Sequence, residues 1–205
     1  MGTMERRARD KAALRGRILD AARAIALREG FAGLTMRKLA AAVEYAPGTI
    51  YLHFDGRDAI ARELCIEGYQ ALWAALQPAA GIADPRDRLA ALARAYVGFG
   101  LEQRELYRLI LMEDPKLLDP LYRDRPIDDP DGPGTRAFGA LVQAFADLGG
   151  EQPARRAEVF LATLHGIVSL RLTCDRFLRT PAEDLVETAV QAVLSSGGPG
   201  LRAGP

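Results

Sequence analysis

A break between two short helical patterns is the feature that most constrains how this chain folds. Residues 35–57 read TMRKLAAAVEYAPGTIYLHFDGR. Apolar residues recur at helical spacing over 36–43, and Thr35 stands where a hydroxyl caps free backbone N–H groups. The pattern stops at residues 44–46, and Pro47 restarts it, since proline suits the first turn of a helix. The stretch therefore predicts two short helices joined by a tight turn.

The second of these helices has two distinct faces. Ile50 and Phe54 are four residues apart and therefore share one face. Thr49, Tyr51 and His53 must then point elsewhere. A helix with an apolar pair facing a core and hydrogen-bonding residues on its outer face is suited to a DNA major groove. We therefore interpret the stretch as a helix-turn-helix.

These residues resemble the helix-turn-helix of the TetR family of transcriptional regulators. The matching residues are Gly30-Phe31, Thr35, Leu39-Ala40, Gly48-Thr49-Ile50-Tyr51, His53-Phe54 and Arg57. Several fixed spacings over about 28 residues are more specific than one short motif. The resemblance is sharp over residues 14–60 and beyond them concerns architecture alone. It implies an all-α fold of about nine helices, with an N-terminal three-helix DNA-binding domain and a C-terminal helical bundle that binds a ligand and dimerises.

The resemblance implies DNA contacts at nine positions of this chain. Those implied to contact phosphate are Thr35, Arg37 and Arg57, those implied to contact bases are Tyr45, Ala46, Pro47 and Thr49, and those implied to bind the DNA backbone are Tyr51 and His53. Phosphate contacts position a protein on DNA, whereas base contacts specify the sequence. Simple packing is the alternative for Tyr51, and a solvent-facing helix end is the alternative for His53.

The turn departs from the family pattern. Where the family usually has Gly-Val followed by Ser, this chain has Glu44-Tyr45-Ala46. Without glycine, either Glu44 takes a backbone conformation that other residues disfavour or the turn differs. The loss of Ser removes a side-chain cap, and a carboxylate near phosphate is repelled unless it faces a base amino group or an arginine. The departure concerns specificity more than the fold.

Further helical patterns flank the helix-turn-helix. Residues 1–10 lack periodicity and predict a loose arm, whose arginines either reach phosphate or a minor groove or are simply solvated. Helices are expected at about 11–28 (ended by Gly30), 57–77, 85–103, 105–113, 135–148, 153–177 and 181–195, with one or two turns at 116–123 and a loop at 124–134. The expected domains are 1–56 for DNA binding and 57–196 for ligand binding and dimerisation, followed by a disordered tail at 197–205.

The aromatic residues of the middle helices have two interpretations. Core packing explains them, and so does the lining of a small-molecule cavity, which needs large apolar residues and a few hydrogen-bonding groups. Because the resemblance implies an effector pocket, the candidates for it are Trp73, Tyr96, Tyr107 and His165. A core or interface position is the alternative for His165.

The last two expected helices carry more apolar surface than one packed face requires. The residues in question are Phe160, Leu164 and Val168 on one helix and Leu185, Ala189 and Val193 on the other. Dimers of the family form by packing these two helices against their twofold mates, and a C2 dimer matches a palindromic operator. The resemblance thus implies a homodimer that binds double-stranded DNA.

Composition excludes several classes of protein. The 205 residues carry no net formal charge, but residues 1–60 contain 11 Lys or Arg and 7 Asp or Glu, so the basic excess lies at the predicted DNA-binding end. Cys65 and Cys174 have no metal-ligand spacing and are expected to be buried as small apolar residues. Because no apolar run of 18 residues and no leader-like segment occurs, we expect a cytoplasmic protein without a membrane partner. We also expect no metal and no cofactor.

These patterns together predict a sequence-specific DNA-binding transcriptional regulator, namely a repressor released by a small apolar or amphipathic effector. An effector-independent DNA-binding dimer and an activator are the alternatives, since a helix-turn-helix does not encode the sign of regulation. An enzyme is rejected because two histidines 112 positions apart, with no nucleophile motif, metal-ligand cluster or glycine-rich phosphate loop, form no catalytic constellation.

Overall fold

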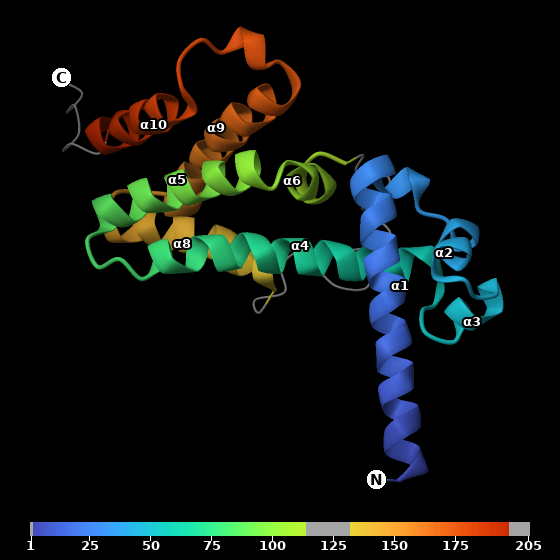
Figure 1. The fold of residues 1–205 in the computed structure, drawn as a ribbon. Helices are drawn as coiled ribbons and strands as arrows, with labels where there is room; N and C mark the ends of the chain where they lie inside the picture. Colours follow the sequence, from blue (N-terminus) through green and yellow to red (C-terminus); the bar gives the residue numbers. More distant parts are fainter. Residues whose placement is uncertain (1, 114–131, 197–205) are drawn as a thin grey trace, which may run out of the picture. The chain divides into compact units, whose positions relative to one another are not determined.

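The computed structural model describes residues 2–113 and 132–196, and within these ranges the chain is helical (Figure 1). The α-helices are α1 (Thr3–Gly33), α2 (Met36–Val43), α3 (Pro47–Tyr51), α4 (Gly56–Ala80), α5 (Pro85–Glu102), α6 (Arg104–Leu111), α8 (Pro133–Asp147), α9 (Pro153–Thr173) and α10 (Ala182–Ser196). A 3-10 helix, η1 (Asp175–Phe177), separates the last two, and no strand occurs in the described ranges. The predicted all-α class is confirmed. The turns expected at 116–123, most of the loop expected at 124–134 and the tail at 197–205 lie outside the described residues.

The described residues form two compact units. Unit 1 contains residues 2–68 and 105–113, and unit 2 contains residues 69–104 and 132–196. The sequence predicts a domain boundary at the start of α4, whereas the compact units divide within α4 and assign nearly all of α6 to unit 1. Compactness follows contacts between distant parts of the chain, which a boundary drawn from sequence patterns does not include.

Unit 1 is built around one apolar core. α1 packs against α2, and α2 packs against α3. The side chains that are completely buried in this core include Ile18, Leu34, Leu39, Ile50 and Ile60. Leu109 of α6 joins the same core. As predicted, Ile50 and Phe54 face inward together, with 0% and 4% of their surfaces exposed.

α1 differs from its prediction at its N-terminal end. Its helix begins at Thr3, so the arm expected to be loose is helical, and Figure 1 shows it extending past α2 and α3 within unit 1. Residues 4–9 of the arm are Met, Glu, Arg and Ala, all good helix formers, and they prolong a helix that is already nucleated. At the other end Gly30 interrupts the helix with φ 69° and ψ 176°, a conformation essentially confined to glycine. The expected helix end at Gly30 is therefore confirmed.

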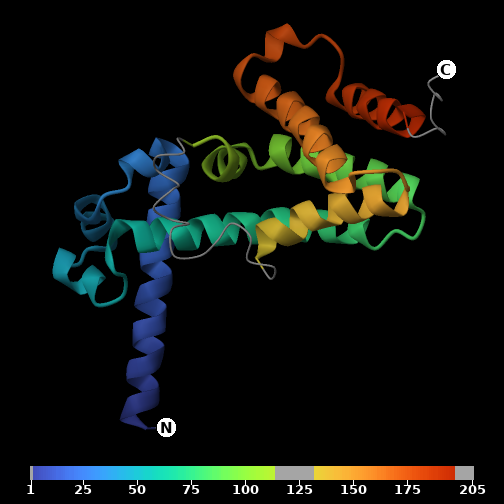
Figure 2. The ribbon, with the colours of Figure 1, turned by 180° about the vertical axis from the view of Figure 1, so that it is seen from behind.

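α5 lies at the centre of unit 2, where it packs against α8, α9 and α10 (Figure 2). Phe145 of α8 and Phe160 of α9 meet edge to face with their ring centroids 5.7 Å apart. A salt bridge of 2.8 Å between Arg88 and Asp147 joins α5 to α8. These contacts join α8 to α9 and α5 to α8 within unit 2.

The end of α9 is shorter than predicted. The helix stops at Thr173 instead of continuing to residue 177, and η1 follows. Arg171 closes this loop, because its guanidinium donates to the Asp175 carboxylate at 2.8 Å and to the carbonyl oxygens of Leu178, at 3.1 Å, and Thr180. Cys65 is buried as expected, whereas Cys174, at the end of α9, is exposed. The expectation for Cys174 is wrong because the helix ends before it.

Candidate nucleic-acid interface

We call the predicted helix-turn-helix, residues 35–57, the reading head. Its first helix, α2, begins with a side-chain cap. The hydroxyl of Thr35 accepts a hydrogen bond of 3.2 Å from the backbone N–H of Lys38. Leu39, Ala40 and Val43 turn into the core, while Thr35 and Arg37 are exposed at the start of α2. The two residues predicted to contact phosphate here are therefore accessible, at a helix start where free N–H groups also favour an anion.

The turn between α2 and α3 has the first of the two geometries that its sequence allowed, a strained Glu44. Glu44 adopts the left-handed conformation, with φ 60° and ψ 40°. This conformation allows the N–H of Tyr45 to donate to the Ala40 carbonyl at 3.0 Å. A non-glycine residue in this region costs about 1–2 kcal/mol. The turn thus keeps the helix-ending geometry of a glycine while it exposes a carboxylate and a tyrosine.

α3 presents an almost continuous exposed surface over its buried residue Ile50. Pro47 occupies its first turn, as predicted. Residues 44–48 are exposed, Thr49 is half-buried, and Tyr45 and Tyr51 expose 41% and 57% of their surfaces. The predicted base contacts and Tyr51 are therefore accessible on the outer side of the turn and α3.

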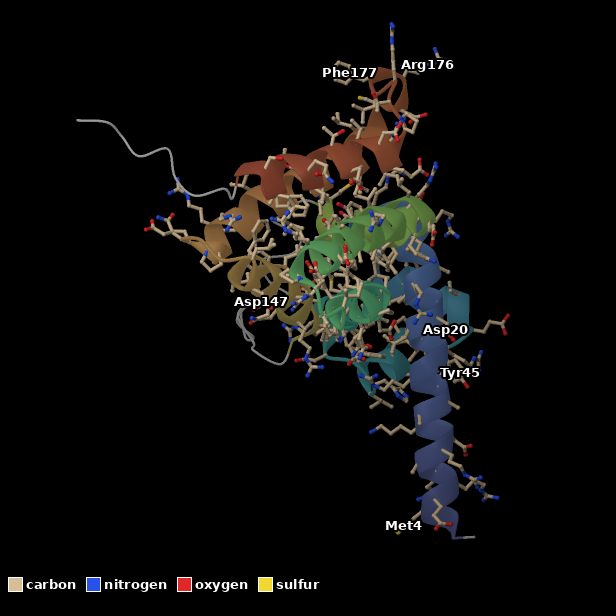
Figure 3. The ribbon with its side chains drawn as sticks, turned by 90° about the vertical axis from the view of Figure 1, so that its left-hand side faces the viewer. Met4, Asp20, Tyr45, Asp147, Arg176 and Phe177 are labelled. Carbon is tan, nitrogen blue, oxygen red and sulfur yellow. The ribbon has the colours of Figure 1, made fainter. Side chains whose placement is uncertain are left out.

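Arg17 of α1 contributes to this face, although the sequence did not indicate it. Its guanidinium donates to the Val43 carbonyl at 3.2 Å and lies 5.6 Å from the centre of the Tyr45 ring. Figure 3 shows Tyr45 beside α1, the helix that carries Arg17. A cation over an aromatic ring is attracted by the ring's negative face. Because 28 positions separate Arg17 from Tyr45, no local pattern could have revealed the contact.

His53 and Arg57 differ from a simple phosphate-contact arrangement. The imidazole of His53 is half-buried, and within the described residues its Nδ1 is buried without a hydrogen-bond partner. The Arg57 guanidinium donates two hydrogen bonds, of 3.0 and 2.9 Å, to the Asp58 carboxylate. An arginine with an acidic neighbour exerts a weaker field on a phosphate than an unpaired one. Both residues stay predicted DNA contacts, with these restrictions.

Ion pairs fix α1 against α4 behind this face. Arg15 binds the Glu63 carboxylate, and Arg23 binds the Glu67 carboxylate at 2.6 Å. The hydrogen bond to Glu63 raises the pKa of Arg15 above its ordinary value. The Arg15 guanidinium also lies 4.4 Å from the centre of the Phe54 ring. Within unit 1, α4 is therefore held to α1 by these ion pairs.

Unit 2 contains an open groove that the sequence did not predict. Its volume is about 510 Å³, and it is lined by Phe145, Glu151, Gln152, Arg155, Arg156, Val159, Phe160, Thr163, Ala189, Ala192 and Val193. None of the four predicted effector-pocket residues lines it. Tyr107 is completely buried in unit 1, while Trp73, Tyr96 and His165 belong to unit 2. Burial lowers the pKa of His165 below its ordinary value.

Three of the six predicted dimer-interface residues are buried within unit 2. Phe160, Leu164 and Val168 expose 2%, 0% and 0% of their surfaces in the single chain, so other residues of α9 offer a second molecule more surface. They point into unit 2 because α9 packs this side against α5 and α8. Leu185, Ala189 and Val193 of α10 are half-buried, and they stay predicted interface residues.

Two negative observations apply to the described parts of the chain. None of the helices there combines the length and the apolar character that crossing a membrane requires. In the same parts, no three His, Cys, Asp or Glu side chains lie together in a way that would hold a metal ion.

Two family models match most of the chain. Residues 18–64 match a model described as bacterial regulatory proteins, tetR family. Residues 89–193 match a model described as tetracyclin repressor-like, C-terminal domain. The first range contains α2 and α3, and the second contains α8, α9 and most of α5 and α10. The first model therefore covers the reading head, and the second model covers most of unit 2.

Individual proteins resemble the chain over different lengths. It is 30% identical over 96 residues to the uncharacterized HTH-type transcriptional regulator YobS of Bacillus subtilis (strain 168), a match that spans 47% of this chain and only half, 50%, of YobS. A protein of unknown function from Rhodococcus sp. RHA1 has a similar structure, with a TM-score of 0.70, 27% identity and coverage of 89% of this chain and 94% of that one. The TetR family transcriptional regulator PfmR from Thermus thermophilus has a TM-score of 0.59 and 18% identity, over 87% of this chain and 97% of PfmR, which shows a common fold.

Proposed function

Since this chain belongs to the TetR family and is a DNA-binding transcriptional regulator, we propose that it is a homodimeric repressor of a palindromic operator, released by a small apolar or amphipathic effector. The observation that carries the proposal is the exposed turn and α3 above the buried residues Ile50 and Phe54. Such a helix presents its polar side to a major groove while its apolar side holds it to the domain.

The proposed DNA contacts divide by chemistry. Tyr45 and Thr49 are the best candidates for hydrogen bonds to base edges, and Ala46 and Pro47 are suited to a thymine methyl group. The remaining predicted contacts, with the DNA backbone, are made by Thr35, Arg37, Tyr51, His53 and Arg57. In a C2 dimer the two reading heads would meet half-sites one helical turn apart, about 34–36 Å, or somewhat more.

The proposed release by an effector requires two states of the dimer. An effector changes DNA affinity only if it binds one state more tightly than the other. Trp73, Tyr96 and His165 of unit 2 remain the candidates to bind it, and complete burial makes Tyr107 the least accessible of the predicted four. If no small molecule that binds unit 2 changes the affinity for DNA, the effector-independent dimer is favoured instead.

The decisive experiment is the selection of bound fragments from random and genomic DNA with purified protein at physiological salt. We expect enrichment of a palindrome, whose symmetry would give the half-site spacing. No enrichment over non-specific binding would overturn the proposal of a sequence-specific dimer on DNA.

Two variants then test the backbone contacts. We expect Tyr51→Ala and Arg57→Ala to weaken binding to all sequences, and the loss of the Arg57 charge to reduce the slope of log affinity against log salt by about 0.9. Arg94→Ala is the matched control, because it removes an exposed charge from unit 2. Unchanged affinity and slope in both test variants would contradict the assignment.

A further inference from the structure

The beginning of α1, residues 3–13, carries an excess of positive charge that extends beyond the reading head. We call these residues the N-terminal segment. They contain four Lys or Arg against two Asp or Glu. Every side chain from Met4 to Ala13 is exposed. Figure 1 shows the segment continuing past α2 and α3 within unit 1, and Figure 3 shows Met4 far beyond Tyr45 along α1. The segment is therefore an accessible, basic extension of the DNA-binding unit.

Three cations of the N-terminal segment differ from the arginines further along α1. Arg15 and Arg23 are paired with carboxylates of α4, and Arg17 donates to the backbone of α2. Within the described residues, by contrast, no carboxylate forms an ion pair with Arg6, Arg7 or Lys11. An opposite charge nearby weakens the field of a cation, so these three attract an external anion more strongly than the paired arginines do.

Two of these cations lie on the side of α1 that faces the core of unit 1. Ile18, Leu14, Lys11 and Arg7 are separated by four, three and four positions, so they follow one another along one side of the helix. Ile18 is completely buried in the core that it shares with α2 and α3, and Leu14 is half-buried. Lys11 and Arg7 continue this side where the packing has ended. They therefore point to the side of α1 on which the reading head lies.

A DNA backbone fits this arrangement of charge. The duplex under α3 continues beyond the bases that α3 reads, and it carries about one negative charge per 1.7 Å of its axis. Lys11 and Arg7 are four residues apart, which is about 6 Å along α1. Two cations at this spacing can meet the backbone of one duplex together.

The helical state of the N-terminal segment decides which part of the DNA it can reach. The sequence allowed either phosphates or a minor groove. An α-helix with its side chains is about 10–12 Å across, whereas the minor groove of B-DNA is about 6 Å wide. The segment is helical from Thr3 onward, so it is too wide to enter this groove. Its long side chains can still reach the phosphates at the edge of the groove.

We propose that the N-terminal segment binds, as a helix, the phosphates of the DNA that flanks each half-site, through Arg7 and Lys11. The proposal rests on the proposed binding of α3 to an operator, and it extends the contact beyond the bases that α3 reads. Because phosphate contacts carry no direct sequence information, the segment adds affinity and fixes orientation without changing the half-site.

Duplexes that carry the selected operator with and without flanking base pairs test the contact. On the flanked duplex, Arg7→Ala combined with Lys11→Ala should reduce the slope of log affinity against log salt by about 1.8 for each bound chain. The affinity advantage of the parent protein should therefore shrink about 12-fold per chain between about 50 and 200 mM salt. On a duplex trimmed to the operator, the parent and the double variant should bind alike.

Arg9→Ala is the matched control for Arg7→Ala. Arg9 lies about 160° around the helix from Arg7, so its substitution removes the same charge from the other side of the segment. An equal change of slope for the two single variants would overturn the assigned side. An unchanged slope for the double variant, with a palindrome still selected by the parent, would overturn the phosphate contact and leave the proposed function intact. A parent that selects no palindrome would overturn both.

Ala12→Pro tests whether the contact needs a helix. Ala12 is exposed, so proline there leaves the core of unit 1 unchanged, but it breaks the preceding turn and keeps every charge. We expect this variant to bind the flanked duplex as weakly as the double variant, with an unchanged thermal midpoint. Ala12→Ser, which keeps the helix, should bind like the parent. Full affinity of Ala12→Pro would overturn the helical contact in favour of a flexible charged tail.

The composition of the flanks separates phosphates from a minor groove. Phosphates are the same in every sequence, whereas the minor groove presents different groups at A·T and G·C pairs. The parent should therefore bind operators with A·T-rich and G·C-rich flanks equally well. A preference for A·T-rich flanks that disappears in the double variant would overturn the phosphate contact and assign Arg7 and Lys11 to the minor groove.

Discussion

The two units of this protein expose aromatic residues of different chemistry. In unit 1 the exposed aromatic residues are Tyr45 and Tyr51, which carry hydroxyl groups, and Arg37 lies on the same reading head. In unit 2 the most exposed large apolar residues are Val159 and Phe177, which have no hydrogen-bonding side-chain group. The first surface suits a charged polymer with polar base edges, whereas the second suits another protein surface. An exposed aromatic residue in unit 1 is therefore suited to DNA, whereas one in unit 2 is suited to a protein partner.

The strongest test of the comparison concerns which side of α9 is inside unit 2. Leu164→Ala removes a completely buried side chain, and we expect a loss of about 2–5 kcal/mol of stability. Val159→Ala, on the exposed side of the same helix, should change stability by no more than about 0.5 kcal/mol. Urea unfolding measures both. A dimer-specific defect with unchanged stability for Leu164→Ala would show that the orientation of α9 is wrong.

A glycine in each unit gives opposite expectations for the same substitution. At Gly30 an alanine Cβ would lie 2.7 Å from the Glu113 carboxylate, with φ at +69°, so Gly30→Ala should cost about 1–3 kcal/mol. At Gly139, exposed within α8, a Cβ meets nothing within 4 Å, and alanine should add about 0.5–1 kcal/mol of stability. Thermal unfolding compares the two. Equal effects would mean that the glycine conformation in unit 1 is not required.

Two substitutions of Glu44 distinguish the effect of its backbone strain from the effect of its charge. Glu44→Gly relieves the left-handed conformation and should stabilise the protein by about 1 kcal/mol. Glu44→Gln removes the carboxylate and keeps the strain, so its stability should stay near that of the parent. Both variants should bind DNA more tightly at low salt, because both remove a negative charge near phosphate. A stability gain in the glutamine variant would contradict the strain explanation.

The contact between Arg17 and Tyr45 should have a smaller effect on operator binding. Only a double-mutant cycle, which measures the interaction energy of the two residues, would detect it. In a double-mutant cycle with Arg17→Ala and Tyr45→Ala, we expect about 0.5–1 kcal/mol of interaction energy in operator binding. Arg28→Ala replaces Arg17→Ala in the control cycle, where the expected coupling is zero. A slope of affinity against salt that falls by about one for Arg17→Ala, without coupling, would make Arg17 a phosphate contact instead.

The smallest expected effects are pH dependences that differ between the units. Burial lowers the pKa of His165 in unit 2, so the folded chain takes up a proton less readily than the unfolded chain, and stability should fall as the pH drops below about 6.5. In unit 1, hydrogen bonds from Lys38 and Arg28 lower the pKa of Glu29, so its contribution persists above the ordinary carboxyl value of 4.5 and is lost below it. Melting temperatures of His165→Gln and Glu29→Gln between pH 8 and 3 should each lose one of these two dependences.

Sequence patterns predicted unit 1 better than unit 2 for a physical reason. The cap at Thr35, the strained residue Glu44 and the helix start at Pro47 depend on neighbours a few positions away, so their residue types predict them. The inward side of α9 depends on α5 and α8, which are distant in sequence, so the sequence assigned Leu164 to the dimer interface although it is buried within unit 2. Arg17 and the groove were missed for the same reason, since each is created by segments that meet only in the folded chain.

The exposed first turns of α1 have a consequence for how this protein responds to heating. Every side chain from Met4 to Ala13 is exposed, so this helical segment is stabilised by its continuity with the rest of α1 and not by packing. Isolated helices of such length are marginal in water, and helix ends fray progressively. The N-terminus should therefore lose its ellipticity gradually, as a sloping baseline in circular dichroism, at temperatures where the cores of both units are still intact.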